Sequence, residues 1–279
     1  MAEPPPNVRL NLTSTPENVV LVREVLSGVA EAIRLGGSDL NDIRTAVTEA
    51  CNNVVLHAYG GEQGPLEIEV CIAEDALSVL VRDHGSGIPT QSDAADTATL
   101  EIGLHVIQTL THQVEFNGVS DGGTEVRMEF AAPSIGMLEP PPEDRVGLSA
   151  LALAGSSTTT VSIAPISLAR TVLPRMVSAL AARAHFSTDR ISDVQLLADA
   201  LVAHAHQAMS GDHLSIGVNV EPRDLELRIA PLGMGRAQRL IGDSEVDGLG
   251  PVIEKLTDRH RVTAAGSHEV LNLHLLDRR

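Results

Sequence analysis

Residues 38–59 read SDLNDIRTAVTEACNNVVLHAY, and their apolar residues recur at the spacing of a helix. An apolar stripe with a period of 3.6 residues is typical of an amphipathic helix that packs against a core. The stripe consists of Leu40, Ile43, Val47, Ala50 and Val54. This stretch therefore predicts a helix with one buried face and one polar face.

Strictly alternating segments follow this helix. PLEIEVCI (65–72) and ALSVLVRD (76–83) place every second residue on an apolar face, which predicts two half-buried strands. VRLNL (8–12) predicts a strand before the helix, and a long helix is expected from about residue 17 to 35. Beyond the paired strands we expect a polar loop at 89–101, a short helix at 102–110 and two strands ending near residue 130. The order of these elements predicts an α+β domain.

The same pattern recurs in the second half. VSIAP (161–165), ISDVQLLADALVAHAHQAM (191–209), HLSIGVNV (213–220) and DLELRIAPLGMG (224–235) follow the order of the first strand, the helix and the strand pair. LGPVIEKLTD (249–258) and SHEVLNLHL (267–275) match the later segments. Order and spacing together predict an internal duplication. We expect domains at 1–131 and 159–279, joined by a Pro-rich, Gly/Ser/Thr-rich linker at 132–158.

Net charge, aromatic content and cysteine count exclude several classes of function. A net charge of −17 argues against a surface that binds nucleic acid, and three Phe, one Tyr and no Trp leave no stacking platform for single strands. Residues 1–139 carry 21 acids against 6 bases, whereas residues 140–279 carry 16 against 14. Cys51 and Cys71 rule out a Cys-rich zinc site and are expected to be small buried residues. The start is not a signal peptide and no run is apolar enough to span a membrane, so a cytoplasmic protein is expected.

Three motifs of the first half carry chemistry. EACNN (49–53) places Glu49 and Asn53 one turn apart on the same helix face. DHGSG (83–87) follows a strand, and GGT (122–124) precedes one. Each alone is ordinary, because Asp-x-Gly-x-Gly is usually a turn and Gly-Gly-Thr is usually part of a hairpin. Their combination in this order is specific.

Together the motifs resemble the N, G1 and G3 boxes of the GHKL ATPase superfamily, which has the Bergerat fold. The short form EAxxNxxxHAY is similar to the anti-sigma factor serine kinases of partner-switching systems. The resemblance covers about residues 7–131 and, in eroded form, 159–277. It implies a two-layer α/β sandwich, a mixed sheet with helices on one face, present twice in tandem. It also implies an ATP site with Mg²⁺.

The resemblance implies a role for each matching residue. Glu49 would be the catalytic general base, and Asn53 would bind ATP as the Mg²⁺ ligand. Asp83 would accept a hydrogen bond from the adenine amino group. Gly85 and Gly87 would let the backbone pass close to the base.

Two further ATP-binding positions follow from the same resemblance. Gly103 would open the helix whose N-terminal amides face the phosphates, and Thr124 would support Asp83 and adenine. One position departs from the family pattern, because TLEIGL (99–104) has Glu101 where the family usually has Gly. A carboxylate near the phosphates would weaken nucleotide binding or raise the Mg²⁺ demand.

The second half lacks the corresponding residues. Alignment by apolar periodicity places Ala200 at the position of Glu49, His204 at that of Asn53 and Pro231 at that of Asp83. We therefore expect residues 159–279 to keep the fold without binding ATP. A tandem fusion of this kind could supply both halves of a family homodimer as a pseudo-dimer within one chain.

The leading interpretation is an ATP-dependent protein serine kinase of the anti-sigma type. Its expected partners are a sigma factor and a STAS-type antagonist protein that it phosphorylates on Ser, with no nucleic acid and no membrane. The alternative is a binding-only regulator with a structural nucleotide site, which Glu101 and the missing Arg of the lid favour. A histidine kinase module fits poorly, because no dimerisation helix with a phosphoacceptor His precedes the pattern.

Overall fold

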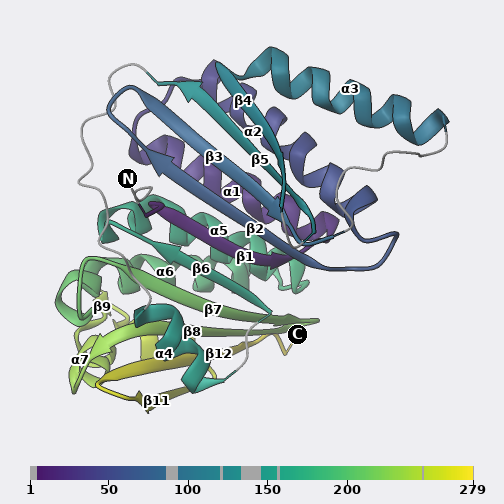
Figure 1. Cartoon of the computed structure of the whole chain (residues 1–279). Helices are drawn as coiled ribbons and strands as arrows, with labels where there is room; N and C mark the ends of the chain where they lie inside the picture. The colour runs from purple at the N-terminus through teal and green to yellow at the C-terminus, as the bar shows by residue number, and fades with distance from the viewer. Residues whose placement is uncertain are drawn as a thin grey trace. The chain divides into compact units, whose positions relative to one another are not determined.

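The computed structural model of the chain describes residues 5–85, 94–119, 122–132, 146–155, 158–246 and 248–278. The chain divides into two compact units, a first unit of residues 6–139 and a second unit of residues 140–279. Figure 1 labels the helices and strands of both units. Each unit is described by itself below.

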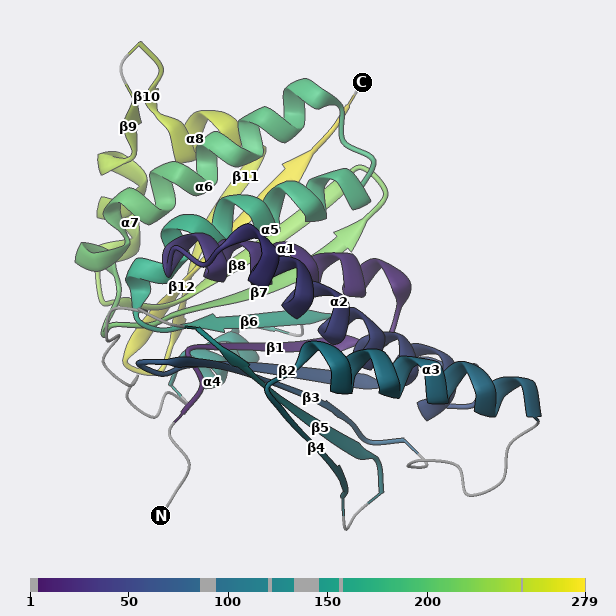
Figure 2. The same cartoon turned by 90° about the horizontal axis from the view of Figure 1, so that it is seen from above.

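The first unit is a five-stranded sheet with helices on one face, as Figure 2 shows. Its strands lie in the order β1-β2-β3-β5-β4, and every neighbouring pair is antiparallel, so the sheet of this unit is antiparallel rather than mixed. The elements in chain order are β1 (Val8–Thr13), α1 (Pro16–Ala32), α2 (Gly37–Asn53), the π-helical turn η1 (Val54–Ala58), β2 (Pro65–Ile72), β3 (Ala76–Asp83), α3 (Ala94–Leu110), β4 (Gln113–Gly118) and β5 (Thr124–Ala131).

The predicted alternation of the strands is confirmed. Leu66, Ile68 and Val70 of β2 are buried, and Ile68 lies opposite Val81 of β3 in the register. The stripe of α2 covers this face with Ile43, Val47 and Ala50, all of them buried. Burying one such side chain stabilises the fold by about 1.5–3 kcal/mol, so the repeated apolar positions determine which face of each element points inward.

The two cysteines differ in their surroundings. Cys51 is fully buried on α2, and burial raises the pKa of its thiol to about 12, so it stays neutral in the folded protein. Cys71 lies on β2 and is only partly buried. The expectation of a small buried residue is thus confirmed for Cys51 and too simple for Cys71.

The second unit repeats the order of elements. It contains α4 (Val146–Ala154), β6 (Thr159–Ile163), η2 (Ile166–Leu168), α5 (Ala169–Arg183), α6 (Thr188–Ala208), β7 (Leu214–Glu221), β8 (Asp224–Gly233), α7 (Arg236–Asp243), β9 (Glu245–Val246), β10 (Gly250–Pro251), α8 (Val252–Leu256), β11 (Arg259–Ala265) and β12 (His268–Leu276). Its sheet has the order β11-β12-β8-β7-β6. This order equals that of the first unit when β6, β7, β8, β12 and β11 stand for β1, β2, β3, β5 and β4. A duplication would produce this agreement.

The predicted linker contains a helix. Residues 146–154 form α4, whose Ala150 and Leu151 are buried against Ala230, Ala265 and Val270 of the sheet. In Figure 1, α4 lies in front of the strands of the second unit and α5 and α6 lie behind them. The expectation of a linker across 132–158 is therefore wrong for this segment, because its apolar side chains pack on the sheet. None of the helices in the described ranges is both long and apolar enough to cross a membrane.

Candidate functional site

The end of β3 turns sharply at Asp83. Its side chain is 3 % exposed, and its Oδ1 accepts a hydrogen bond from the backbone N–H of Gly85 at 2.8 Å. A side chain at Gly85 would collide with the backbone carbonyl of Ala58, the last residue of η1. Gly85 therefore allows the turn to lie directly on the helical segment that continues α2. Gly87 lies outside the described residues.

A second pair of glycines closes on the same turn. Gly122 and Gly123 have φ values of +94° and +96°, and a Cβ at Gly123 would collide with the backbone carbonyl of Asp83. Since Arg82 pairs with Glu125 in the register of β3 and β5, the next positions along these strands, Asp83 and Thr124, are adjacent. The structure thus brings together the G1-like and G3-like motifs.

Replacing Gly123 by alanine is expected to destabilise the first unit by roughly 3 kcal/mol, because the methyl group meets backbone and the φ value is unfavourable. The matched control is Gly118→Ala, since a Cβ at Gly118 meets nothing within 4 Å. Urea unfolding measures both variants. Equal stability of the two would show that the Gly123 backbone does not lie against Asp83.

Tyr59 also holds the turn at Asp83–Gly85, through hydrogen bonds of its hydroxyl group. Its hydroxyl accepts a hydrogen bond from the backbone N–H of His84 at 2.9 Å and donates one to the carbonyl of Pro65 at 2.5 Å. Gly64 packs on the ring, where a Cβ would collide with it. Burial raises the pKa of Tyr59, so the hydroxyl keeps its proton and can donate. Tyr59 is the last residue of the EAxxNxxxHAY pattern, and the sequence alone indicates no role for it.

Removing the Tyr59 hydroxyl in Tyr59→Phe is expected to cost about 1–2 kcal/mol of stability, because two hydrogen bonds are lost. The pKa of Tyr59 in the folded protein lies above the value of about 10 that it has in the unfolded chain. The contribution of the protonated hydroxyl to stability is therefore fully present below a pH of about 10 and is lost as the pH rises through the pKa of the folded state. Urea unfolding at pH 7 measures the difference. The control is Thr45→Ala, which removes an exposed hydroxyl bonded within its own helix. A Tyr59→Phe variant as stable as wild type would contradict the assignment.

Glu49 and Asn53 lie on the face of α2 that α3 approaches. A Cβ built on Gly103 would lie 3.4 Å from Glu49 Oε2 and 3.5 Å from Asn53 Oδ1. Both side chains are partly buried. The absence of a side chain at Gly103 therefore leaves the backbone of α3 next to a carboxylate and an amide oxygen.

The placement of Gly103 corrects one expectation. Helix α3 begins at Ala94, not at residue 102, so Gly103 lies inside the helix and does not open it. Its helical amides are used within α3 and do not point at a ligand from a helix start. The side chain of Glu101 lies outside the described residues.

The two groups of motif residues are linked through η1. Asn53 ends α2, and Ala58 follows five residues later, roughly 7 Å along a helical axis. Ala58 contacts the turn that contains Asp83 and Gly85. Between them, His57 has a buried Nε2 without a hydrogen-bond partner among the described residues, a feature the sequence analysis did not predict.

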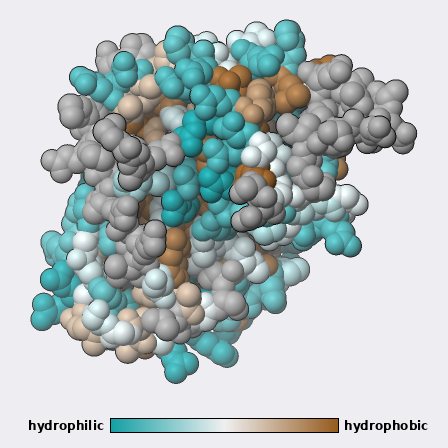
Figure 3. Space-filling view, in the orientation of Figure 1, coloured by the Kyte–Doolittle hydropathy of each residue, from teal (hydrophilic) through white to brown (hydrophobic). Residues whose placement is uncertain are grey.

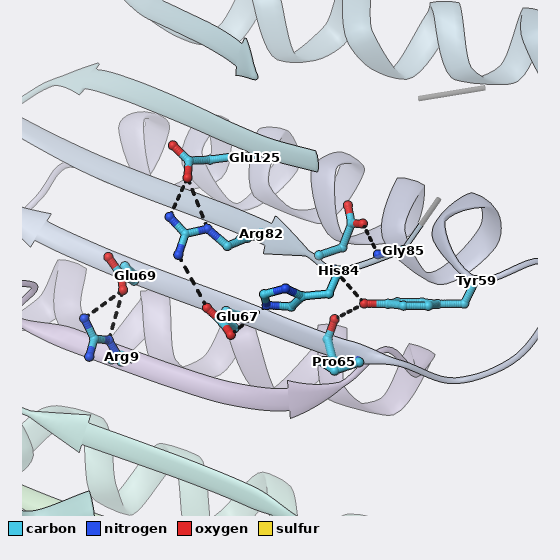
Figure 4. A network of polar contacts seen from close by, with 10 residues as sticks. Arg9, Tyr59, Pro65, Glu67, Glu69, Arg82, His84, Gly85 and Glu125 are labelled. Carbon is cyan, nitrogen blue, oxygen red and sulfur yellow. Dashed lines mark hydrogen bonds and ion pairs between the residues drawn. The ribbon is translucent and has the colours of Figure 1, made fainter. Parts of the chain in front are cut away.

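Charged side chains cover the sheet face opposite the helices, as Figure 4 shows. Glu67 accepts from His84 Nε2 at 2.9 Å and lies 3.7 Å from Arg82, which also bonds Glu125. The hydrogen bond to Glu125 is the main cause that raises the pKa of Arg82. Figure 3 shows the hydrophilic surface over these strands. These ion pairs are partly exposed, so each adds little stability, but they connect the residue after Asp83 to the sheet.

The second unit fills the corresponding region with its own side chains. Ala200 is buried on α6, and Pro231 is buried on β8. Arg236 packs on Gly233 and donates to the carbonyls of Gln207 and Met209 at 3.0 and 3.1 Å. The buried apolar residues of α7 and α8 are Ala237, Leu240, Ile241, Val252 and Ile253. The described part of this unit thus places no carboxylate–amide pair at these positions of α6.

Known proteins share the pattern of the first unit. The family described as "Histidine kinase-like ATPase domain" matches residues 12–130. The serine-protein kinase RsbW of Bacillus pumilus is 31 % identical over 136 residues, which are 43 % of this chain and 83 % of that protein. The RsbW of Bacillus velezensis is 33 % identical over 134 residues, which are 43 % and 82 %.

The chain belongs to the RsbW family. The matched range contains every site residue predicted from the sequence, from Glu49 to Thr124, and it ends at the last strand of the first unit. The α+β architecture, with helices on one face of the sheet, agrees with this family. The second unit lies outside the matched range.

The residues present fit the nucleotide and metal that the family implies. Gly85 packs against the backbone of Ala58 and Gly123 against that of Asp83, so the two glycines hold the turn that carries the Asp83 carboxylate. Glu49 and Asn53 supply oxygen atoms, the ligand type that Mg²⁺ prefers. No group of three His, Cys, Asp or Glu side chains in the described ranges could hold a metal alone, so Mg²⁺ would share its ligands with phosphates and water.

Proposed function

We propose that the chain is an ATP-dependent protein serine kinase of the anti-sigma type, which binds a sigma factor and phosphorylates a STAS-type antagonist protein on Ser. The observation that carries the proposal is the carboxylate–amide pair Glu49 and Asn53 beside Gly103, in a chain similar to serine-protein kinases over most of their length.

Each residue has a defined task in this proposal. Asp83 accepts a hydrogen bond from the adenine amino group through its Oδ2, because its Oδ1 already accepts one from the backbone N–H of Gly85. Thr124 supports Asp83 from the adjacent strand. Asn53 would hold Mg²⁺, which would supply charge neutralisation at the phosphates. Glu49 takes the proton from the Ser hydroxyl as the Ser oxygen attacks the γ-phosphorus of ATP, and ADP leaves with the electron pair of the P–O bond that breaks. The resemblance gives Gly87 the task of letting the backbone approach the base.

The position of Gly103 gives it a different task from the one first expected. In the middle of α3 it keeps the backbone close to Glu49 and Asn53, so it limits the space around the metal and phosphates. Any larger side chain there would extend between the two polar groups. We propose that Gly103 is part of the ATP site for this reason.

The second unit is proposed to be a copy that does not bind nucleotide. Support comes from Ala200 and Pro231 at the positions of Glu49 and Asp83, and from Arg236 packed on Gly233. Its role would be to stand for the second subunit of a dimer within one chain. The domain boundaries in this proposal are 1–131 for the kinase domain and 159–279 for the copy.

A binding-only regulator is the second candidate, favoured by Glu101 and by the missing Arg of the lid, since residues 83–126 contain neither Lys nor Arg. Phosphate charge would then be met only by Mg²⁺ and backbone amides.

A transfer assay separates the two candidates. The full chain is incubated with Mg²⁺, γ-labelled ATP and a purified STAS-domain protein, and label on Ser is measured by mass spectrometry. The kinase proposal expects stoichiometric transfer that requires Mg²⁺. No transfer, together with measurable ATP affinity, would overturn it and support the binding-only function.

A further inference from the structure

The second unit carries a groove that the kinase proposal does not use. Its volume is about 580 Å³, the size of a ligand pocket, and it lies across β7, β8, β12 and β11. The register places Arg259, His274 and Glu226 side by side on three neighbouring strands of this groove. Arg261 and Asn272 form the next row. The groove therefore runs across the sheet and ends at β11.

Most charges within the groove are already paired. His274 Nε2 lies 2.7 Å from Asp224 Oδ1. Glu226 accepts from Asn219 at 2.9 Å and lies 3.5 Å from Arg228. These acids are therefore not available to attract a cationic ligand. Glu221, at the β7 end, has no ion-pair partner within the described ranges and keeps that end acidic.

The β11 end is basic and unpaired. The side chains of Arg259 and Arg261 are exposed, and neither guanidinium has a hydrogen-bond or ion-pair partner within the described part of the chain. His260 lies between them on the same strand and is also exposed. Two guanidinium groups two residues apart on a strand point to the same face, about 7 Å from each other. That spacing matches two acidic side chains at alternate positions of an extended chain.

Strand β11 is also an edge of its sheet. It pairs with β12 alone among the described strands of this unit, and Figure 1 shows it as the outermost strand. An edge strand offers unpaired N–H and C=O groups to another extended segment. The matching edge of the first unit, β4, carries Glu115 and no basic residue. The two edges therefore differ in the charge they present.

We propose that β11 and its groove bind an acidic, extended segment of a partner protein, which adds as a strand along β11 and places alternate carboxylates on Arg259 and Arg261. The backbone of the segment pairs with the edge, and its side chains enter the groove. The net charge of −17 repels acidic peptides from the protein as a whole, so attraction at this edge is local. This surface belongs to the second unit, whereas the proposed ATP site belongs to the first.

Fluorescence anisotropy of the full chain with a labelled octapeptide of alternating Glu and Val tests the proposal. The matched probe has Gln in place of Glu. We expect the acidic peptide to bind at least tenfold more tightly than the neutral one. The double variant Arg259→Gln/Arg261→Gln should weaken binding at least tenfold, whereas the control Arg170→Gln/Arg239→Gln, on exposed helix positions, should change it less than twofold.

Hydrogen exchange with the peptide bound tests the strand addition itself. Amides of 259–265 should exchange more slowly, while those of 113–118 on β4 should not change. Absence of binding, equal affinity of the two double variants, or binding without slower exchange in β11 would each overturn the proposal. None of these readouts involves ATP or phosphoryl transfer, so a failure here would leave the kinase proposal standing.

Discussion

The Glu49→Ala variant is expected to lose phosphoryl transfer by about 10²- to 10⁴-fold while it still binds Mg-ATP. A positioned general base contributes a factor of this size to the rate. Glu49 lies one turn before Asn53 on α2, and its Oε2 lies beside Gly103, so under the proposed function it would stand next to the phosphates. Because the side chain is only partly buried, its removal should leave the fold intact.

The rate of label transfer to a STAS-domain protein measures the loss, and calorimetry measures the affinity for Mg-ATP. Glu62→Ala is the matched control, since Glu62 is exposed and lies outside the motifs. If the Glu49→Ala variant transferred phosphate at a rate within threefold of wild type, Glu49 would not be the general base. A variant that also loses ATP binding would assign Glu49 to binding instead.

The Asp83→Asn variant is expected to bind ATP about 30- to 100-fold more weakly. The side chain is almost fully buried, so its second oxygen works in an environment where a charged hydrogen bond contributes about 2–3 kcal/mol. Asparagine preserves the shape and can still accept from Gly85, but it then turns an N–H₂ group toward the adenine amino group. Two donors would face each other.

Calorimetric titration of Mg-ATP into Asp83→Asn measures this loss, with Asp75→Asn in the exposed β2–β3 turn as control. Thermal unfolding without nucleotide shows whether the turn is retained. Unchanged ATP affinity in a folded Asp83→Asn protein would show that this carboxylate does not recognise the base.

Periodicity predicted the regular elements well, because burial determines which face of a strand or helix is apolar. The alternation in 65–72 and 76–83 and the stripe on 38–54 all appear as β2, β3 and α2. The start of α3 and the whole of α4 were missed for opposite reasons. Residues 94–101 lack an apolar stripe, so the start of α3 read as a loop. Residues 146–154 are mostly apolar without a clear helical stripe and follow a Pro-rich stretch, so α4 was predicted as part of the linker.

The site was predicted in part. The sequence could indicate Glu49, Asn53 and Asp83, because their spacing follows a known pattern. It could not place Tyr59, because the partners of its hydroxyl, His84 and Pro65, meet only in the folded protein. The internal position of Gly103 in α3 depends on the same tertiary packing. Local sequence thus indicates which groups to consider, and long-range contacts determine how these groups are held.

The central claim is that Asp83 and the pair Glu49–Asn53 act on one nucleotide. Amide NMR of the full chain, titrated with Mg²⁺ and a non-hydrolysable ATP analogue, tests it most directly. The account predicts that the amides of Asn53, Asp83 and Gly103 shift along a single saturation curve, while those of Ala200 and His204 in the second unit do not move. Shifts at Asp83 and Asn53 that follow different curves, or saturable shifts at Ala200 and His204 alone, would contradict it.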